Sequence, residues 1–271
     1  MTALPTRVCS TMWNGSSSEL GASMKAVELL SLLVPAVAAG PVAADDALPK
    51  GEPGEVRGLG EQRKVVRDGD LTGCVDLTAL AKRPHLYAAG PLEGLKGEVT
   101  VWDGKASLAR WEAGKVVTTE EFKGKACFLV YAQVPTWTES KLPAGLDKPD
   151  DLEADIFLEA RKAGVPTDRP FPFLLRGTAQ KVKLHILNKT DNAPHNPEEH
   201  AKVKVPVVLE GSEVDVIGFY SKKHAGVFTH HDSYAHMHAL TADGKVSGHV
   251  DQLSPGGEMR LYLPVAADPR R

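Results

Sequence analysis

From about residue 84 onward, the chain is a series of short apolar or alternating runs separated by turn-forming residues, and this pattern restricts the folds open to it. Runs of this length and spacing are typical of β-strands rather than helices. Residues 97–102 and 105–111 alternate on either side of Asp103-Gly104, a strong signal for a hairpin with a two-residue turn. The sequence therefore predicts a mostly β protein whose first sheet begins near residue 84.

One stretch in the middle of the chain has a different character. Residues 143–164 mix apolar and acidic residues at helical spacing and end at Gly164, with Pro166 just beyond, so we expect a helix that joins two sheet-rich halves. The apolar residues 127–134, followed by Pro135, predict a strand buried on both faces. Further strands are expected at residues 173–187, 203–209, 214–219, 234–240, 246–253 and 259–263, with a polar loop at 188–202. The predicted fold class is α+β, with two halves of mixed or antiparallel sheet and few helices.

The N-terminal segment has the features of an export signal. From Met24 the chain places a lysine before a short apolar stretch and then small residues up to Ala44, the layout of a signal peptide cleaved after Ala44. The apolar stretch is too short to span a bilayer, so stable membrane insertion is not expected. The alternative is a disordered tail. Export predicts a periplasmic or secreted protein, and an unused signal predicts a cytoplasmic one.

These features divide the chain into four predicted parts. Residues 1–44 are an upstream extension and signal peptide, and residues 45–70 are a polar linker. Residues 71–150 form the N-terminal sheet domain, and residues 151–271 form the C-terminal sheet domain. Export would leave Cys74 and Cys127 as the cysteines of the mature chain, where a disulfide could persist, and the alternative is two buried thiols.

Charge and motifs exclude several functions. The formal net charge is −3 and there is no long basic block, so nucleic acid is not an expected partner. The chain also lacks the G-x-S-x-G motif of serine hydrolases and glycine-rich phosphate loops.

Three histidines carry the strongest chemical signal. His236 and His238 lie two residues apart in a predicted strand, so both rings emerge on the same face. The following Asp243-Gly244 predicts a tight turn, whose register places His249 opposite His238 and Asp251 opposite His236. Three imidazoles that leave a fourth position open are typical of a catalytic zinc site. We therefore predict Zn²⁺ bound by His236, His238 and His249.

The alternative is a polar stripe or a set of hydrogen-bonded core histidines, and the third histidine on the same face favours the metal. His230 and His231, in the preceding loop, are interpreted as surface or entrance residues. The remaining histidines show no such spacing and are expected to have ordinary roles; they are His85, His185, His195, His200 and His224.

Residues 218–253 resemble the C-terminal signature of alpha-acetolactate decarboxylases, with a Gly-Phe strand, an H-x-H pair and a final Gly-His-Val. The spacing of the three histidines is similar to that of the family's zinc ligands. Residues 85–117 and 170–187 look like two further family segments. The resemblance, over about residues 75–264, implies zinc-dependent decarboxylation of a 2-hydroxy-3-oxo acid, acetolactate, to acetoin and CO2, with a site between the two halves. A homodimer is left open.

The resemblance also implies catalytic residues. Glu98 occupies the position of the family's active-site glutamate and is expected to deliver a proton. With Gly177 aligned, Leu174 stands at the family's arginine position, and Arg176, two residues along, is the expected cation for the substrate carboxylate. For the family's C-terminal glutamate the chain offers only Asp268, while Asp251 is a candidate ligand or a residue that orients an imidazole.

Two other readings stay open. One is a secreted zinc-binding protein of the same fold that has lost decarboxylase activity, and the other is a metal-dependent enzyme with another substrate. A cupin-type oxygenase fits less well, because no glutamate follows the H-x-H pair at a spacing of a few residues.

Overall fold

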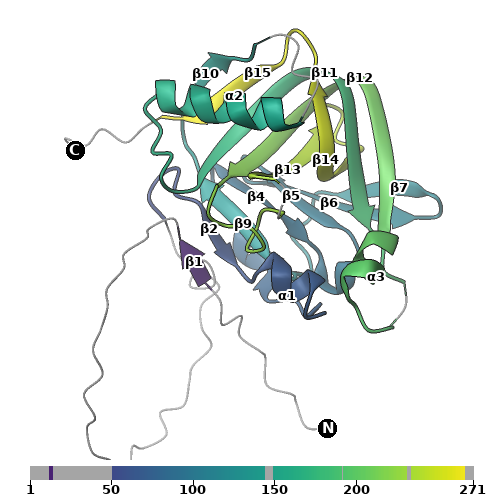
Figure 1. The fold of residues 1–271 in the computed structure, drawn as a ribbon. Helices are drawn as coiled ribbons and strands as arrows, with labels where there is room; N and C mark the ends of the chain where they lie inside the picture. Colours follow the sequence, from purple (N-terminus) through teal and green to yellow (C-terminus); the bar gives the residue numbers. More distant parts are fainter. Residues whose placement is uncertain (1–11, 15–50, 144–148, 191, 231–232, 266–271) are drawn as a thin grey trace, which may run out of the picture.

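The computed structural model describes residues 12–14, 51–143, 149–190, 192–230 and 233–265. In this part of the chain, two large antiparallel sheets pack against each other, accompanied by a two-stranded sheet and three α-helices (Figure 1). The expectation of a sheet-rich protein with few helices is therefore confirmed.

The first large sheet is built from the N-terminal half. Its order is β1-β2-β9-β4-β5-β6-β7, and neighbouring strands are all antiparallel. The predicted hairpin is present, since Trp102 pairs with Lys105 across Asp103 and Gly104, which both have positive φ (47° and 78°) as a type I′ turn requires. The strands are β1 (Met12–Asn14), β2 (Arg57–Leu59), β4 (Leu86–Pro91), β5 (Glu98–Trp102), β6 (Lys105–Glu112), β7 (Lys115–Thr119) and β9 (Leu129–Gln133).

The second large sheet closes on itself, and it is built from the C-terminal half together with β10, which precedes the joining helix and lies within the predicted N-terminal domain. Its order is β10-β15-β11-β12-β13-β14, and β14 pairs in addition with β11. The strands are β10 (Trp137–Lys141), β11 (Phe171–Leu187), β12 (Lys204–Tyr220), β13 (Ala235–Thr241), β14 (Ser247–Pro255) and β15 (Arg260–Pro264).

The long strand β11 makes this closure possible. Its first part pairs with β15 through residues 174–176, and its second part pairs with β14 through residues 179–185. Gly177 lies at the change of partner with a φ of 129°, a backbone conformation that residues with a Cβ rarely adopt. The register shifts just beyond it, between Ala179 and Lys181, and such irregularities bend a strand. As a result, β14 leaves β13 and crosses to β11.

The faces of the two large sheets enclose an apolar layer. Phe128 and Val130 of the first half and Ile217 and Phe219 of the second belong to the same buried cluster. Helix α2 (Pro149–Lys162) covers the other face of the second sheet through Ile156 and its apolar neighbours (Figure 1). The helix agrees with the sequence prediction. It ends at Lys162, and Gly164 follows with a φ of 75°, which is typical of the residue just beyond a helix C-terminus.

The remaining elements are short. They are α1 (Gln62–Val66), α3 (Pro197–Lys202), the 3₁₀ turns Leu77–Leu80 and Glu93–Leu95, and the paired strands β3 (Val75–Asp76) and β8 (Lys125–Ala126).

Three details differ from the sequence-based expectation. The segment predicted as a linker holds β2 and α1, because Val56, Leu59 and Val65 are buried against the sheets. The loop expected at 188–202 contains α3, which begins at an Asn196 cap. The two strands expected around Gly211 are one continuous strand, β12, since β11 pairs with it on both sides of that glycine.

The proposed signal peptide lies outside the described residues. Within the described part, no helix combines the length and apolarity needed to cross a bilayer. Cys74 and Cys127 are neighbours without being joined in a disulfide, and Cys74 Sγ lies 3.0 Å from the carbonyl oxygen of Cys127.

Candidate metal centre

The β13–β14 hairpin brings the three predicted histidines together. His238 pairs directly with His249 across the two strands, in the register that Asp243-Gly244 predicts. His236 and His238 share one face of β13, and their rings are stacked 5.2 Å apart. The ring of His249 lies 4.7 Å from that of His236 and 5.4 Å from that of His238. One ring nitrogen from each of the three lies within 4.8 Å of the others, so the described residues contain a group able to hold a metal ion.

The hydrogen bonds of these rings fit metal ligands better than core histidines. Both ring nitrogens of His236 and Nε2 of His238 are buried and make no hydrogen bond. Buried polar atoms almost always have a partner, so an unpaired nitrogen on each of two neighbouring rings fits a bound metal ion. Nδ1 of His238 lies 3.0 Å from Thr100 Oγ1 of β5, and a bond at that nitrogen orients the ring with Nε2 toward the other histidines.

Burial also keeps the three imidazoles neutral. It lowers the pKa of His236 to about 3 and holds the pKa values of His238 and His249 well below 6.5. A neutral imidazole offers the lone pair that a metal ion binds, whereas an imidazolium does not. The cluster is therefore prepared for a cation at neutral pH.

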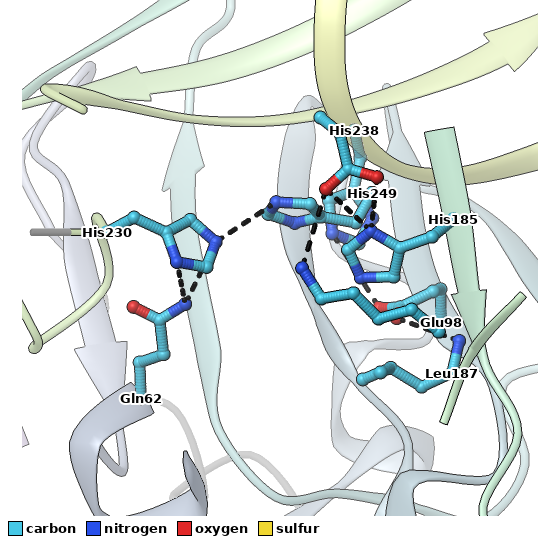
Figure 2. A network of polar contacts seen from close by, with 9 residues as sticks. Gln62, Glu98, His185, Leu187, His230, His238 and His249 are labelled. Carbon is cyan, nitrogen blue, oxygen red and sulfur yellow. Dashed lines mark hydrogen bonds and ion pairs between the residues drawn. The ribbon is translucent and has the colours of Figure 1, made fainter. Parts of the chain in front are cut away.

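Glu98 lies beside the cluster, at the start of β5. Its Oε2 is 3.8 Å from Nε2 of His238, and its Oε1 accepts a hydrogen bond of 3.4 Å from the Leu187 amide (Figure 2). Burial raises the pKa of this carboxyl well above 4.5, so the carboxyl binds its proton more tightly than an exposed glutamate does. Gly97, the residue before β5, lets the backbone of β6 pack closely there, because a Cβ at this position would lie 2.2 Å from the carbonyl oxygen of Ala109.

Two histidines that were expected to have ordinary or entrance roles also reach the cluster. His185 of β11 pairs with His249, and the two ring centroids are 4.8 Å apart. Nε2 of His230 lies 3.3 Å from Nε2 of His249, and Gln62 contacts the far side of the His230 ring (Figure 2). Neither has a spacing signal in the sequence, because β11 and the loop before β13 meet the hairpin only through the closure of the sheet.

Asp251 has a different position from the predicted one. The pairing of β13 with β14 ends at His238 and His249, and β14 then continues along β11. A register shift at this point leaves Asp251 as the extra residue of a bulge. Its carboxylate binds Nδ1 of His185 at 2.8 Å, so it orients an imidazole as expected, but not that of His236.

Arg176 is not brought to the histidines. Its Nε donates to Asp215 Oδ1 at 2.7 Å, and its guanidinium lies 5.5 Å from the ring centre of Trp102. In the sheet, Asp215 of β12 stands between Arg176 and β13. The arginine therefore has a partner of its own, two strands away from the histidine pair. Asp268 and His231 lie outside the described residues.

Comparisons with known proteins agree with this picture. The family model described as alpha-acetolactate decarboxylase matches residues 87–268, which is well over half of the chain.

The chain belongs to the alpha-acetolactate decarboxylase family.

Members of this family are named for a carboxy-lyase activity on a small acid, and family members depend on a metal ion. The match spans Glu98, the three histidines, the second large sheet and the first large sheet from the second residue of β4 onward, but not β1 and β2.

Solved structures of this family share the fold. The acetolactate decarboxylase of Bacillus subtilis strain 168 superposes with a TM-score of 0.59 at 15% identity, covering 76% of this chain and 82% of that one. The enzyme from Bacillus subtilis subspecies spizizenii gives 0.59 at 14% identity, with 76% and 84% covered. A Staphylococcus aureus protein of unknown function, described as similar to alpha-acetolactate decarboxylase, gives 0.57 at 16% identity, with 72% and 78% covered. No curated protein sequence matches the chain.

The bond between Thr100 and His238 gives a first testable prediction. Thr100→Val keeps the shape of the side chain but removes the hydroxyl that holds the ring, so we expect metal affinity to fall about 10–100-fold. Competition with a chromophoric chelator measures the change. The matched control is Thr138→Val at an exposed position of β10, which should bind metal like the parent protein. An unchanged affinity for Thr100→Val would show that the hydroxyl does not position His238.

Proposed function

We propose that this protein is a zinc-dependent decarboxylase that converts a 2-hydroxy-3-oxo acid such as acetolactate to the hydroxyketone and CO2. The observation that carries the proposal is the cluster of three buried imidazoles beside a buried glutamate, in which His236 and His238 have ring nitrogens without a hydrogen-bond partner. Three neutral nitrogen donors suit Zn²⁺ and leave a coordination position for substrate. His236, His238 and His249 would hold the ion, which would polarise the hydroxyl and carbonyl oxygens and stabilise the charge that develops as CO2 leaves.

The residues of the chain supply the rest of the reaction. When the bond to the carboxylate breaks, its electron pair remains on the substrate carbon, and that carbon then needs a proton. Glu98 is positioned to deliver it, because its carboxyl is next to His238 and keeps a proton to a higher pH than usual. The Leu187 amide holds one carboxyl oxygen and leaves the other facing the histidines.

A second candidate is a metal-binding protein of this fold without decarboxylase activity. The position of Arg176 favours it, since this arginine is bound to Asp215 and the substrate carboxylate would need another cation. The two candidates agree on the metal and differ on turnover.

Metal content and acetoin formation distinguish them. The chain from Asp45 onward is purified, its zinc is measured, and CO2 and acetoin are assayed with racemic acetolactate before and after chelation. We expect about one zinc per chain, and turnover that chelation abolishes and added zinc restores. Adding zinc should also raise the Tm, because a ligand at 100 times its Kd stabilises the folded state by about 2.7 kcal/mol. Zinc binding without turnover would support the second candidate, and absence of metal binding would refute both.

Export remains a proposal that rests on the sequence. The charged, apolar and small-residue regions from Met24 to Ala44 support a periplasmic or secreted protein.

A further inference from the structure

A small cavity with a basic lining lies beside helix α1. It has a volume of about 240 Å³ and lies between this helix and the segment that ends at His230. Its polar lining comprises Gln62, Arg63, Arg67 and His230, and within the described residues it contains no carboxylate. We call it the α1 cavity. Because pockets for drug-sized ligands span about 300–1,000 Å³, the α1 cavity suits a smaller molecule, and its charge favours an anion.

The two arginines lie on the same side of α1. Arg63 and Arg67 are one helical turn apart, and both are exposed. Like charges at this spacing repel each other, and an anion bound between them would offset that repulsion. Arg63 contacts Glu61 through Nε, so the terminal nitrogens of its guanidinium are not part of that ion pair. A guanidinium is always charged in proteins and matches a carboxylate with two parallel hydrogen bonds, so this pair is suited to a small carboxylate.

Helix α1 is attached to the segment that carries His230. The backbone N–H groups of Gln62 and Arg63 donate to carbonyl oxygens of residues 226–227, both at 2.8 Å. The side-chain nitrogen of Gln62 lies 3.2 Å from Nε2 of His230, and that ring nitrogen lies 3.3 Å from Nε2 of His249 (Figure 2). A continuous series of contacts therefore connects the α1 cavity with the metal centre.

The α1 cavity and the metal centre also share lining residues. Gln62, Val66 and His230 line the small space in which Glu98 and His236 meet, as well as the α1 cavity. These shared side chains form the wall between the two spaces. A molecule that moves from one space to the other has to pass the contact between Gln62 and His230.

A second cavity reaches His230 and His249 from the side of α2. Its lining includes Glu153 and Asp251 as well as Lys204, and the two carboxylates repel an incoming anion. The α1 cavity has the opposite balance of charge, and an opening lined by one sign of charge concentrates ligands of the other sign. The route past α1 is therefore the more favourable one for an anion.

We propose that the α1 cavity is the entrance to the metal centre, and that Arg63 and Arg67 bind the carboxylate of the substrate there before it reaches the histidines. The inference rests on the proposed function for the identity of the acid, but anion binding at α1 is tested without turnover. It gives the substrate a cationic contact, which Arg176, bound to Asp215, does not provide. The two arginines lie outside residues 87–268, so the family match does not cover them.

The first experiment measures anion binding alone. Arg63→Gln/Arg67→Gln is compared with the parent and with Arg161→Gln/Arg169→Gln, a control with the same change of charge. Arg161 and Arg169 are exposed, one in the last turn of α2 and the other in the segment that follows it. The probe is 2-hydroxy-2-methylpropanoate, with its neutral amide as reference. Both are added to metal-free protein, and the backbone amide NMR signals of α1 report binding.

The parent and the control should bind the acid and not the amide. The affinity of Arg63→Gln/Arg67→Gln for the acid should fall about 10–100-fold, as expected when hydrogen bonds to charged groups are lost. The Tm of each variant shows that it folds. Equal affinity of the two double variants for the acid, or equal binding of acid and amide by the parent, would overturn the anion site.

The second experiment tests the route. With zinc-loaded protein and acetolactate at low ionic strength, Arg63→Gln/Arg67→Gln should lower kcat/KM about tenfold and leave kcat near the parental value, because the arginines act before the chemical step. Added salt should lower kcat/KM of the parent and of the control more than that of this variant, since salt screens the attraction.

The two proposals fail in different ways. If the acid binds at α1 but no CO2 is released from acetolactate, the proposed decarboxylation fails and the anion site stands. If Arg63→Gln/Arg67→Gln releases CO2 with parental kcat/KM and parental salt dependence, the decarboxylation stands and the entrance is refuted.

Discussion

His238→Ala is expected to remove bound zinc and to abolish acetoin formation. His238 is fully buried, and its Nε2 has no hydrogen-bond partner, while its Nδ1 is held by Thr100. Loss of an outer partner of a metal ligand already costs about 10–100-fold in affinity, so loss of the ligand itself should cost more. Metal analysis after gel filtration and the acetoin assay measure the two effects.

The control for this variant is His85→Ala. The imidazole of His85 is half-exposed and is paired with Asp103, in the turn between β5 and β6 of the first sheet. It should retain zinc and turnover. Because alanine at position 238 leaves a cavity, the Tm of both variants is compared with that of the zinc-free parent. A folded His238→Ala protein that keeps zinc with parental affinity would show that the three histidines are not the metal site.

The metal centre is the part of the site that local sequence rules predict best. The register of a hairpin follows from its turn, and Asp243-Gly244 together with the H-x-H pair was sufficient to place His249 opposite His238. The same rule failed two residues later, at Asp251. There β14 changes partner from β13 to β11, and a bulge shifts the register. A change of strand partner depends on the arrangement of the whole sheet, so no local sequence pattern predicts it.

Other residues around the site could not be predicted for the same reason. His185 lies on β11, and only the closure of the sheet brings it next to His249. Glu98 carries no signal of its own among the acidic residues of the chain, and only the family resemblance indicates it. The family resemblance implies Arg176 because it lies two residues beyond Leu174, but sequence cannot show that Asp215 stands opposite and binds it.

Glu98→Gln is expected to lower acetoin formation about 10²–10⁴-fold, the usual contribution of a positioned proton donor, while the protein keeps its zinc. The raised pKa of Glu98 favours the protonated carboxyl, and glutamine has nearly the same shape as that form. The amide oxygen of the glutamine can still accept the hydrogen bond from the backbone N–H of Leu187. The variant should therefore fold, bind the substrate and fail only in proton delivery. Turnover is measured with acetolactate, and zinc content is measured on the same sample.

A control variant distinguishes proton delivery from general damage. Glu93→Gln changes another glutamate of the first half. The carboxylate of Glu93 accepts a hydrogen bond from the backbone N–H of Gly73, away from the histidines, so this variant should leave turnover unchanged. The KM of Glu98→Gln should stay close to that of the parent, since the defect lies in a step after binding. If the loss appeared in KM and kcat were parental, Glu98 would bind the substrate rather than protonate it. If zinc were lost as well, the carboxylate would be a metal ligand, and the proton would have to come from another group at the site.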